Sequence, residues 1–405
     1  MAAKQRVIII GAGYAGLKAL RGLARSHEID ITLIDQNSYH YLQTDVYDFI
    51  ANKTNLSDIA VDLYTLTASF KGRVTFLQEE VIRIDFTNKN ITTNHSRQHY
   101  DYLIIATGSR TLLPDSIEGL AHHFHGVKSL PNALHFKQRF EECMYRKIET
   151  EGKCSLDSNF NIIVGGGGLS GVEIAAEMVA YSKAFYKNTG YLCGGVRVMV
   201  INSSDVLLKG NDPFLQEVTK KRFEALGIEV IWGRRVKKVT ADSVILDNGT
   251  ELRMNFLIWT GGITVPSLIK NLDVKKNKKG QLLVDEYYRL SDYPEVFCIG
   301  DSAQMFDPLS GGLLPPTAQA AELGGSYVAR NILRSVHGKA FKKERVAMQG
   351  MFAALGGYYG AGVVMNWLRI KGKKAFYFKK LIEKSYYYPL LKRCREGYKL
   401  MTQGD

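Results

Sequence analysis

The sequence predicts an α/β protein built from two doubly wound folds, each with a parallel sheet between helices. A strand, a Gly-rich turn and a helix occur in residues 6–23, and the same order returns in residues 161–180. A short β-rich apolar stretch follows each unit, at 31–34 and at 196–201. Strand–helix–strand units of this kind build parallel sheets, so two of them predict two such folds in one chain.

The segments around these units supply further strands and one long helix. Glycine, asparagine and proline mark the turns, and apolar runs between them mark the strands. The predicted elements are a turn region at 88–94, a buried strand at 101–105, a hairpin at Asp247-Asn-Gly249, a strand at 296–299 and a helix at 317–333 after a Pro-Pro start.

Length and shifts in composition divide the chain into three regions. At 405 residues it is too long for one ordinary domain. Beyond Gly338 the composition becomes aromatic and basic. We therefore expect a discontinuous first domain at 1–115 and 290–338, a second domain at 116–289, and a C-terminal region at 339–405.

The composition is that of a globular protein, with 45% hydrophobic and 23% charged residues. Five scattered cysteines form no C-x-x-C, so we expect no metal site, no dithiol motif and a reducing, cytosolic setting. We expect no signal peptide, and the sequence contains no run of 18 apolar residues. Residues 366–405 contain eleven Lys/Arg and three Asp/Glu, so they carry eight of the thirteen net positive charges.

The first Gly-rich turn has the fingerprint of a dinucleotide-binding, Rossmann-like fold. It reads Gly11-Ala-Gly13-Tyr-Ala-Gly16 and follows the apolar strand 7–10. The first glycine permits the tight turn, the second lets the backbone approach a pyrophosphate, and the third lets the helix pack on the strand. Asp35 ends the next strand, where a carboxylate accepts hydrogen bonds from a ribose.

The second Gly-rich turn has the same pattern but lacks the acid. It reads Gly166-Gly-Gly168-Leu-Ser-Gly171, and the next strand ends at Asn202. An acid there binds the 2′-hydroxyl of NAD and repels a 2′-phosphate, whereas Asn202 does not exclude the phosphate by charge. The sequence therefore leaves open NADH, NADPH, or a fold that has lost its nucleotide.

Two further motifs resemble those of pyridine nucleotide–disulfide reductase-like flavoproteins. Asp101-Tyr-Leu-Ile-Ile-Ala-Thr107-Gly108 looks like their A-T-G strand. Phe297-Cys-Ile-Gly300-Asp301 looks like their second FAD motif, whose aspartate approaches the ribityl chain. The resemblance implies that the first domain holds FAD.

Within that group the chain is most similar to the type II NADH:quinone oxidoreductases. The segments that carry the likeness are Val164-Gly-Gly-Gly-Gly-Leu-Ser-Gly-Val-Glu173, Ile258-Trp-Thr-Gly-Gly262 and Pro315-Pro-Thr-Ala318-Gln319-Ala-Ala321. The resemblance implies a monotopic enzyme on the cytoplasmic face of the membrane that passes electrons from NAD(P)H through FAD to a quinone without pumping protons. A homodimer is compatible with it.

The resemblance also assigns roles to individual residues. Glu173 corresponds to a carboxylate near the flavin that handles protons or positions substrates. Gln319, preceded by Ala318, corresponds to the amide that lines the flavin and quinone face. Lys379 lies about where the family has a lysine near the flavin. The family's second glutamine, four residues after the first, is Leu323 here.

Two other functions fit the same scaffold. A sulfide:quinone oxidoreductase needs cysteines near the flavin, but Cys154, Cys298 and Cys394 form no plausible pair. A flavin-binding sensor or scaffold without quinone turnover is motivated by Asn202 and Leu323. Anaerobic reduction by NAD(P)H followed by reoxidation with quinone separates these functions.

The C-terminal region has the composition of a membrane-surface element. Residues 366–391 alternate aromatic and basic side chains, and we expect short amphipathic helices that place rings at the lipid boundary and ammonium groups on lipid phosphate. A solvated basic helix is the alternative. Stacking on single-stranded nucleic acid is a third, but we expect no nucleic-acid partner because the rest of the chain offers no groove for it. The lysines in this prediction are Lys371, Lys373, Lys374, Lys379, Lys380 and Lys384.

Overall fold

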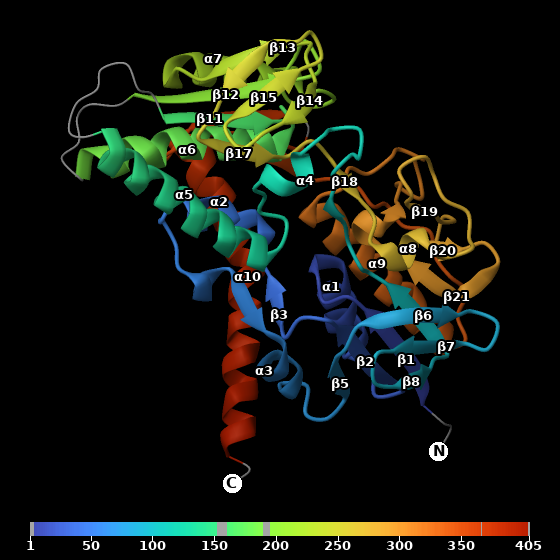
Figure 1. The fold of residues 1–405 in the computed structure, drawn as a ribbon. Coiled ribbons are helices and arrows are strands. Elements are labelled where there is room, and N and C mark those ends of the chain that lie inside the picture. The colour runs from blue at the N-terminus through green and yellow to red at the C-terminus, as the bar shows by residue number, and fades with distance from the viewer. Residues whose placement is uncertain (1–3, 152–159, 189–194, 366, 404–405) are drawn as a thin grey trace.

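The computed structural model describes residues 4–151, 160–188, 195–365 and 367–403. Figure 1 shows two bodies that each contain a sheet, with the C-terminal helix starting beneath the upper body and projecting downward beside the lower one.

The first sheet has six strands, of which five are parallel. β1 lies at its centre, paired with β2 on one side and β9 on the other. The short β20 is antiparallel to β21 at one edge. In spatial order the strands are β20 (Arg289–Leu290), β21 (Tyr293–Cys298), β9 (Tyr102–Ile105), β1 (Gln5–Ile10), β2 (Ile29–Asp35) and β5 (Val74–Gln78).

Two helices pack closely against each other on this sheet. They are α1 (Tyr14–Leu23) and α9 (Ala318–Val336). A Cβ on Gly325 would collide with the carbonyl oxygen of Ala15, so glycine is required for this close approach. Because α1 begins at the first Gly-rich turn and α9 at Ala318, their contact brings those two segments to one side of the sheet (Figure 1).

The second sheet has four strands and is fully parallel. Its interior residues are apolar, as expected for a sheet with helices on its faces. In spatial order the strands are β13 (Glu229–Trp232), β12 (Val196–Asn202), β11 (Phe160–Gly165) and β17 (Phe256–Trp259). The helices of this domain are α4 (Leu120–His123), α5 (Leu130–Glu151), α6 (Leu169–Asn188) and α7 (Pro213–Leu226).

Smaller sheets and short helices complete the two bodies. β10 (Arg110–Thr111) pairs with β18 (Ile263–Thr264) and so joins the ends of two distant segments. The other small strands are β3 (Tyr39–Tyr41) with β4 (Ala60–Asp62), β6 (Val81–Asp85) with β7 (Asn90–Thr93) and β8 (Arg97–His99), β14 (Val236–Val239) with β15 (Ser243–Leu246) and β16 (Glu251–Arg253), and β19 (Leu282–Leu283) with β22 (Ala303–Gln304). The short helices are η1 (Gln43–Asp45), α2 (Val46–Ile50), η2 (Leu56–Asp58), α3 (Leu63–Ala68), α8 (Ser267–Lys270) and η3 (Gly300–Ser302).

The C-terminal region is an antiparallel sheet followed by one long helix. The sheet contains β23 (Gly350–Ala354), β24 (Gly360–Val364) and β25 (Leu368–Gly372), and the helix is α10 (Lys373–Thr402). The prediction of short helices is therefore wrong. α10 stays continuous through Pro389 because it packs along its length, with Phe376 and Leu390 buried and Gly397 against the Thr65 carbonyl of α3.

The turn region expected at 88–94 is wrong in its bounds, because β7 occupies most of it as the middle strand of an antiparallel sheet. The other predicted elements of the two doubly wound folds are confirmed. The strands expected at 101–105 and 296–299 are β9 and β21, the hairpin at Asp247-Asn-Gly249 joins β15 to β16, and the helix expected at 317–333 is α9. The domain limits stay a prediction. Strands from before residue 106 and after residue 288 do share the first sheet, as a discontinuous domain requires.

Among the described residues, no helix is both long enough and apolar enough to cross a membrane.

Candidate active site

The loop between β1 and α1 has the backbone geometry that a pyrophosphate requires. Gly11 adopts φ = +101°, and a Cβ there would collide with the Ala106 carbonyl oxygen. A Cβ on Gly16 would collide with the Gly11 carbonyl oxygen. A Cβ on Gly13, by contrast, would meet no atom within 4 Å. The loop therefore needs two glycines for its own shape and keeps open space beside the third, at the N-terminus of α1.

Asp35 lies beside this loop at the end of β2. Its Oδ2 accepts a hydrogen bond from the Ala12 N–H at 2.7 Å, and its Oδ1 accepts one from the Asn37 N–H at 2.8 Å. Burial raises the pKa of Asp35, and these N–H groups partly offset that rise. The carboxylate is thus fixed next to the phosphate cradle, where a ribose would donate to it.

Two further segments reach the same edge of the sheet because β9 and β21 are neighbours. Gly108 and Gly300 both adopt positive φ, at +67° and +72°. Thr107 Oγ1 lies 2.8 Å from Ser302 Oγ, and Ser302 Oγ donates to the Gly108 carbonyl at 2.8 Å. These contacts hold together the loops that follow the two strands.

Asp301 is held on this edge by a hydroxyl and an ammonium group. Its Oδ2 accepts from Ser109 Oγ at 2.5 Å and lies 3.3 Å from Lys128 Nζ. Lys128 also donates to Gln43 Oε1 at 3.3 Å. Neither Ser109 nor Lys128 belongs to a sequence motif, so neither could be predicted as a site residue.

The second Gly-rich loop repeats the first in its backbone. Gly166 adopts φ = +118°, and a Cβ there would press against Thr260. A Cβ on Gly171 would collide with the Gly166 carbonyl oxygen, whereas one on Gly168 would meet no atom within 4 Å. Both loops therefore fit a dinucleotide, since each leaves its free space at the glycine where a pyrophosphate approaches.

Asn202, at the end of β12, makes different contacts from Asp35. Its Nδ2 donates to the Val206 carbonyl at 2.8 Å and to the Ser204 carbonyl at 3.1 Å. The residue is 6% exposed. The side chain thus fixes the loop that follows the strand, and its role as a ribose ligand stays a prediction.

Glu173 lies in the first turns of α6 and is buried. Its Oε1 accepts from the Ala354 N–H at 2.9 Å and lies 3.4 Å from Lys379 Nζ. Burial raises the pKa of Glu173, while Lys379 and the Ala354 N–H partly offset the rise. The structure therefore brings Glu173 and Lys379 together, although 206 positions separate them in the printed sequence.

Lys379 is part of a larger buried charge network. Lys379 Nζ lies 2.6 Å from Glu383, and Lys380 Nζ lies 2.5 Å from the same carboxylate. Lys380 also pairs with Asp45 at 2.9 Å and with Asp48 at 2.6 Å. The charge network consists of Lys53, Lys379, Lys380, Asp45, Asp48, Glu173, Glu177 and Glu383, with Lys53 joining Asp48 to Glu177.

The prediction that Lys379 and Lys380 face lipid is therefore wrong. Their side chains are 14% and 19% exposed. Lys379 pairs with Glu173 of α6, and Lys380 pairs with Asp48 of α2. The sequence signal for these ion pairs was spacing, since Lys379 and Lys380 precede Glu383 by four and three residues on one helix. Asp45, Asp48 and Lys53 gave none, since their partners lie far away in the chain.

The network contains five carboxyl groups and three lysines, so its charges do not balance when all are ionised. Burial raises the pKa values of Glu173 and Glu177, and burial with repulsion from Glu383 raises that of Asp45 to about 6. Burial lowers the pKa of Lys379, but Glu173 and Glu383 outweigh it and raise that pKa well above its usual range. The surplus of carboxyl groups means that the network can store a proton beside Glu173.

Strand β23 connects Glu173 with the second predicted catalytic residue. Gln319 Oε1 accepts from the N–H of Gln349, just before β23, while Ala354 at its other end donates to Glu173. Five residues of strand span roughly 16 Å. Ala318 begins α9, and Leu323, one turn after Gln319, is partly buried against the core.

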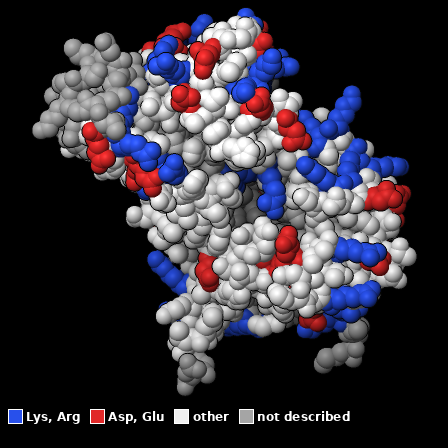
Figure 2. Space-filling model, in the orientation of Figure 1, with Lys and Arg blue, Asp and Glu red and all other residues white. Residues whose placement is uncertain are grey.

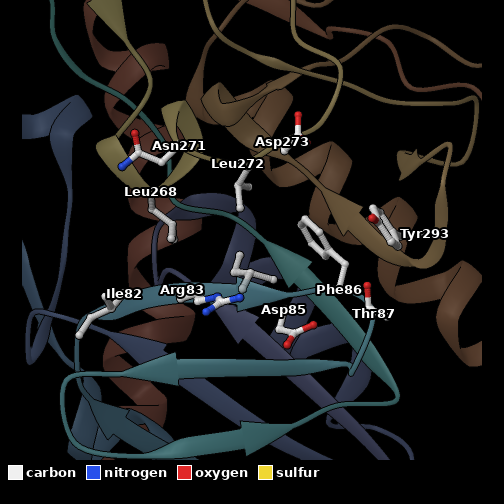
Figure 3. A pocket seen from close by; sticks show the side chains of 11 residues that line it. Ile82, Arg83, Asp85, Phe86, Thr87, Leu268, Asn271, Leu272, Asp273 and Tyr293 are labelled. Carbon is white, nitrogen blue, oxygen red and sulfur yellow. The ribbon is translucent and has the colours of Figure 1, made fainter.

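A pocket of about 420 Å³ lies elsewhere, between β6 and the segment around α8 (Figure 3). Phe86 and Tyr293, which line it, stack with ring centroids 4.5 Å apart. None of the predicted site residues lines this pocket. The face drawn in Figure 2 is instead hollowed between the two bodies, with Lys and Arg side chains beside the hollow.

The described cysteines do not form a reactive centre. Cys298 is buried in β21, and burial raises the pKa of its thiol. Cys143 and Cys394 are partly buried, and burial raises their pKa values too. All three are free thiols, and Cys154 lies outside the described residues. Low thiolate content does not favour sulfur chemistry at these three positions.

Comparison with known proteins places these features in context. A family model described as pyridine nucleotide-disulphide oxidoreductase matches residues 5–325. Type II NADH:quinone oxidoreductases of Staphylococcus aureus are 27% identical over 389 residues, or 94% of this chain and 94% of theirs.

Solved structures share the fold over nearly the whole chain. The NDH2 of Plasmodium falciparum in complex with NADH has a TM-score of 0.86 at 19% identity and covers 99% of this chain and 98% of its own. The sulfide:quinone oxidoreductase of Aquifex aeolicus has a TM-score of 0.79 at 21% identity and covers 97% of this chain and 92% of its own.

Proposed function

Because the chain belongs to the pyridine nucleotide-disulphide oxidoreductase family, we propose that it is a type II NADH:quinone oxidoreductase. It passes electrons from NADH through FAD to a quinone. The observation that carries the proposal is the extent of the likeness, which spans 94% of this chain and 94% of the relative. The family model covers both glycine loops.

The first glycine loop and its neighbours bind FAD. Gly13 leaves room for the pyrophosphate, Asp35 faces the adenosine ribose, and Asp301 lies at the end of β21 for the ribityl chain. FAD, when bound, supplies the chemistry that accepts hydride and releases electrons to a quinone. The second glycine loop binds NADH, with Gly168 as the point of closest approach.

The charge network serves proton supply. Reduction of a quinone to a quinol needs two electrons and two protons, and a hydride from NADH brings two electrons and one proton. The second proton comes from solvent or protein. Glu173 has a raised pKa and belongs to a network with surplus carboxyl groups, so it can hold a proton at Oε1 or Oε2 and release it during quinone reduction.

The exposed face of β25 and α10 is the membrane-contact surface in this proposal. Large apolar side chains are exposed along it, and lysines flank them. The apolar residues are Met365, Trp367, Leu368, Tyr377, Phe378, Leu381, Ile382 and Tyr388, and the exposed lysines are Lys371, Lys373, Lys374 and Lys384. The projecting end of α10 carries few charged side chains on the face in Figure 2. Such a surface suits the lipid headgroup boundary. The cytoplasmic face and a homodimer stay predictions.

The test is a pair of anaerobic half-reactions on the purified protein. NADH should bleach the flavin band, and a quinone added afterwards should restore it. Bleaching without reoxidation by quinone would favour a sensor or scaffold. Bleaching by sulfide in place of NADH would favour a sulfide:quinone oxidoreductase.

A further inference from the structure

The end of β12 lacks the group by which dinucleotide folds reject NADPH. An acid at this position repels a 2′-phosphate, and Asn202 carries no charge. The Asn202 amide is already engaged, because Nδ2 donates to the Val206 and Ser204 carbonyls. Asn202 therefore shapes the loop without opposing a phosphate beside it.

Strand β13 places a cation next to this loop. β13 pairs in parallel with β12, with Trp232 opposite Asn202. Two residues further, the Arg234 N–H donates to the Asn202 carbonyl at 3.3 Å. Arg234 thus follows the outer strand at the same edge of the sheet where Asn202 ends the inner one.

The Arg234 guanidinium is available to a new anion. Its nearest carboxylate, Asp247, lies 3.9 Å away, and the two side chains are 45% and 42% exposed. An exposed pair at this distance contributes little, so turning the guanidinium away costs little. Ser203, directly after Asn202, is exposed and offers a hydroxyl. Asp205 on the same loop is also exposed, and its negative charge would weaken the binding of an anion here.

We propose that Arg234, with Ser203, forms a subsite for the 2′-phosphate of NADPH, so that this chain uses NADPH as well as NADH. A guanidinium binds a phosphate through two parallel hydrogen bonds, which a 2′-hydroxyl cannot match. The inference rests on the proposed function, since it concerns the nucleotide bound at the second glycine loop.

The first experiment compares the two nucleotides on the FAD-loaded full chain. Flavin reduction is measured anaerobically, and kcat/KM for NADH and NADPH should agree within about tenfold. Arg234→Ala should lower the value for NADPH by about tenfold or more and leave that for NADH unchanged. Arg253→Ala, an exposed arginine of β16 in the same domain, is the matched control and should change neither value.

A second variant, Ser203→Asp, adds repulsion to a 2′-phosphate without disturbing the loop, because Ser203 is exposed. Asn202→Glu is less suitable, because it would remove the hydrogen bonds to Val206 and Ser204 and so mix loop damage with charge. Ser203→Asp should lower use of NADPH by about tenfold or more while use of NADH persists.

A binding measurement isolates the phosphate from the chemistry. By calorimetry, the wild type should bind 2′,5′-ADP more tightly than 5′-AMP, and Arg234→Ala should remove the difference. Failure of both nucleotides to reduce the flavin would overturn the proposed function. Reduction by NADH alone, with NADPH more than about a hundredfold worse, would overturn only the phosphate subsite. An equal effect of Arg234→Ala on both nucleotides would overturn it as well.

Discussion

Gly13 and Gly168 leave open space beside the backbone, whereas Lys379 and Lys380 of α10 are enclosed by carboxyl groups. At the glycine loops the main chain makes the functional geometry, because glycine has no side chain to fill the space. At α10 it is made by charged side chains from four elements, η1, α2, α6 and α10 itself. The difference teaches that each loop can be altered at its open glycine, Gly13 or Gly168, without touching the fold, while the charge network couples function to stability.

The largest expected effect separates cofactor binding from folding at the first loop. Gly13→Val places its side chain in the open space and at φ = −76°, which valine adopts without strain. The protein should fold but purify colourless, because the pyrophosphate can no longer approach. Absorbance of the flavin and circular dichroism check the two halves of this expectation. A yellow, fully loaded variant would contradict the assignment of FAD to this loop.

The same change at the second loop should give the opposite colour. Gly168→Val should leave FAD bound, because Gly168 belongs to the other cradle. Flavin reduction by NADH should fall by at least about a hundredfold, or roughly 2.7 kcal/mol. Stopped-flow absorbance measures it. If Gly168→Val also loses FAD, the two loops do not serve separate nucleotides.

The glycine loops were predictable from the sequence because the constraint that requires glycine there is local. Collisions of a Cβ with a neighbouring carbonyl depend on local backbone shape, and a strand, a turn and a helix fix that shape within twenty residues. The charge network was not predictable. Asp45 and Lys380 pair across 335 positions, and only tertiary packing brings them together. Lys379 and Lys380, which the sequence pattern assigned to a membrane surface, are internal for this reason.

The next effect tests whether the network acts in catalysis. Glu173→Gln keeps an acceptor for the Ala354 N–H but cannot hold and release a proton. Reoxidation of the reduced flavin by quinone should slow by about a hundredfold, within the usual range for general acid–base catalysis. Flavin reduction by NADH should stay within twofold or so, because hydride transfer needs no proton from Glu173. Equal slowing of both half-reactions would indicate a structural role for Glu173.

A smaller effect is expected for membrane binding, and the structure decides how to measure it. Truncation near Leu368 would remove Lys379 and uncover α3, so loss of function would carry no information about lipid. Replacing Tyr377, Leu381 and Ile382 with glutamine spares the buried face of α10 and the stacking of Phe378 on Phe352. Co-sedimentation with anionic vesicles should weaken by about tenfold or more, because these side chains supply the apolar part of the contact. The lysines that remain contribute only about 1 kcal/mol each.

The exposed lysines provide the matched set for this test. Replacing Lys371, Lys373, Lys374 and Lys384 with glutamine should remove the part of vesicle binding that salt screens, because charges act over a Debye length of about 8 Å at physiological ionic strength. The apolar set should leave that salt dependence intact. Unchanged binding in both variants would rule out this face as the membrane contact.

The smallest effect concerns the stability cost of the network. The pKa of Asp45 rises from 3.8 to about 6 in the folded protein, through burial and repulsion from Glu383. An acid with a raised pKa keeps a proton that the unfolded chain loses, so folding stability falls as pH rises from about 4 to 6. Above that window the cost is at most about 3 kcal/mol, from 1.36 kcal/mol for each pKa unit. Asp45→Asn cannot ionise and removes it.

Thermal unfolding at pH 4.5 and pH 7.5 measures this difference. Asp45→Asn should raise Tm at pH 7.5, by roughly 2–4 °C for each kcal/mol in a domain of moderate size, and should change it little at pH 4.5. Asp292→Asn, an exposed aspartate outside the network, is the control and should leave both values unchanged. A lower Tm for Asp45→Asn at pH 7.5 would mean that the ion pair with Lys380 outweighs burial. The network would then stabilise the fold through Asp45, and its surplus of carboxyl groups would have to be borne by Glu173 and Glu177 alone.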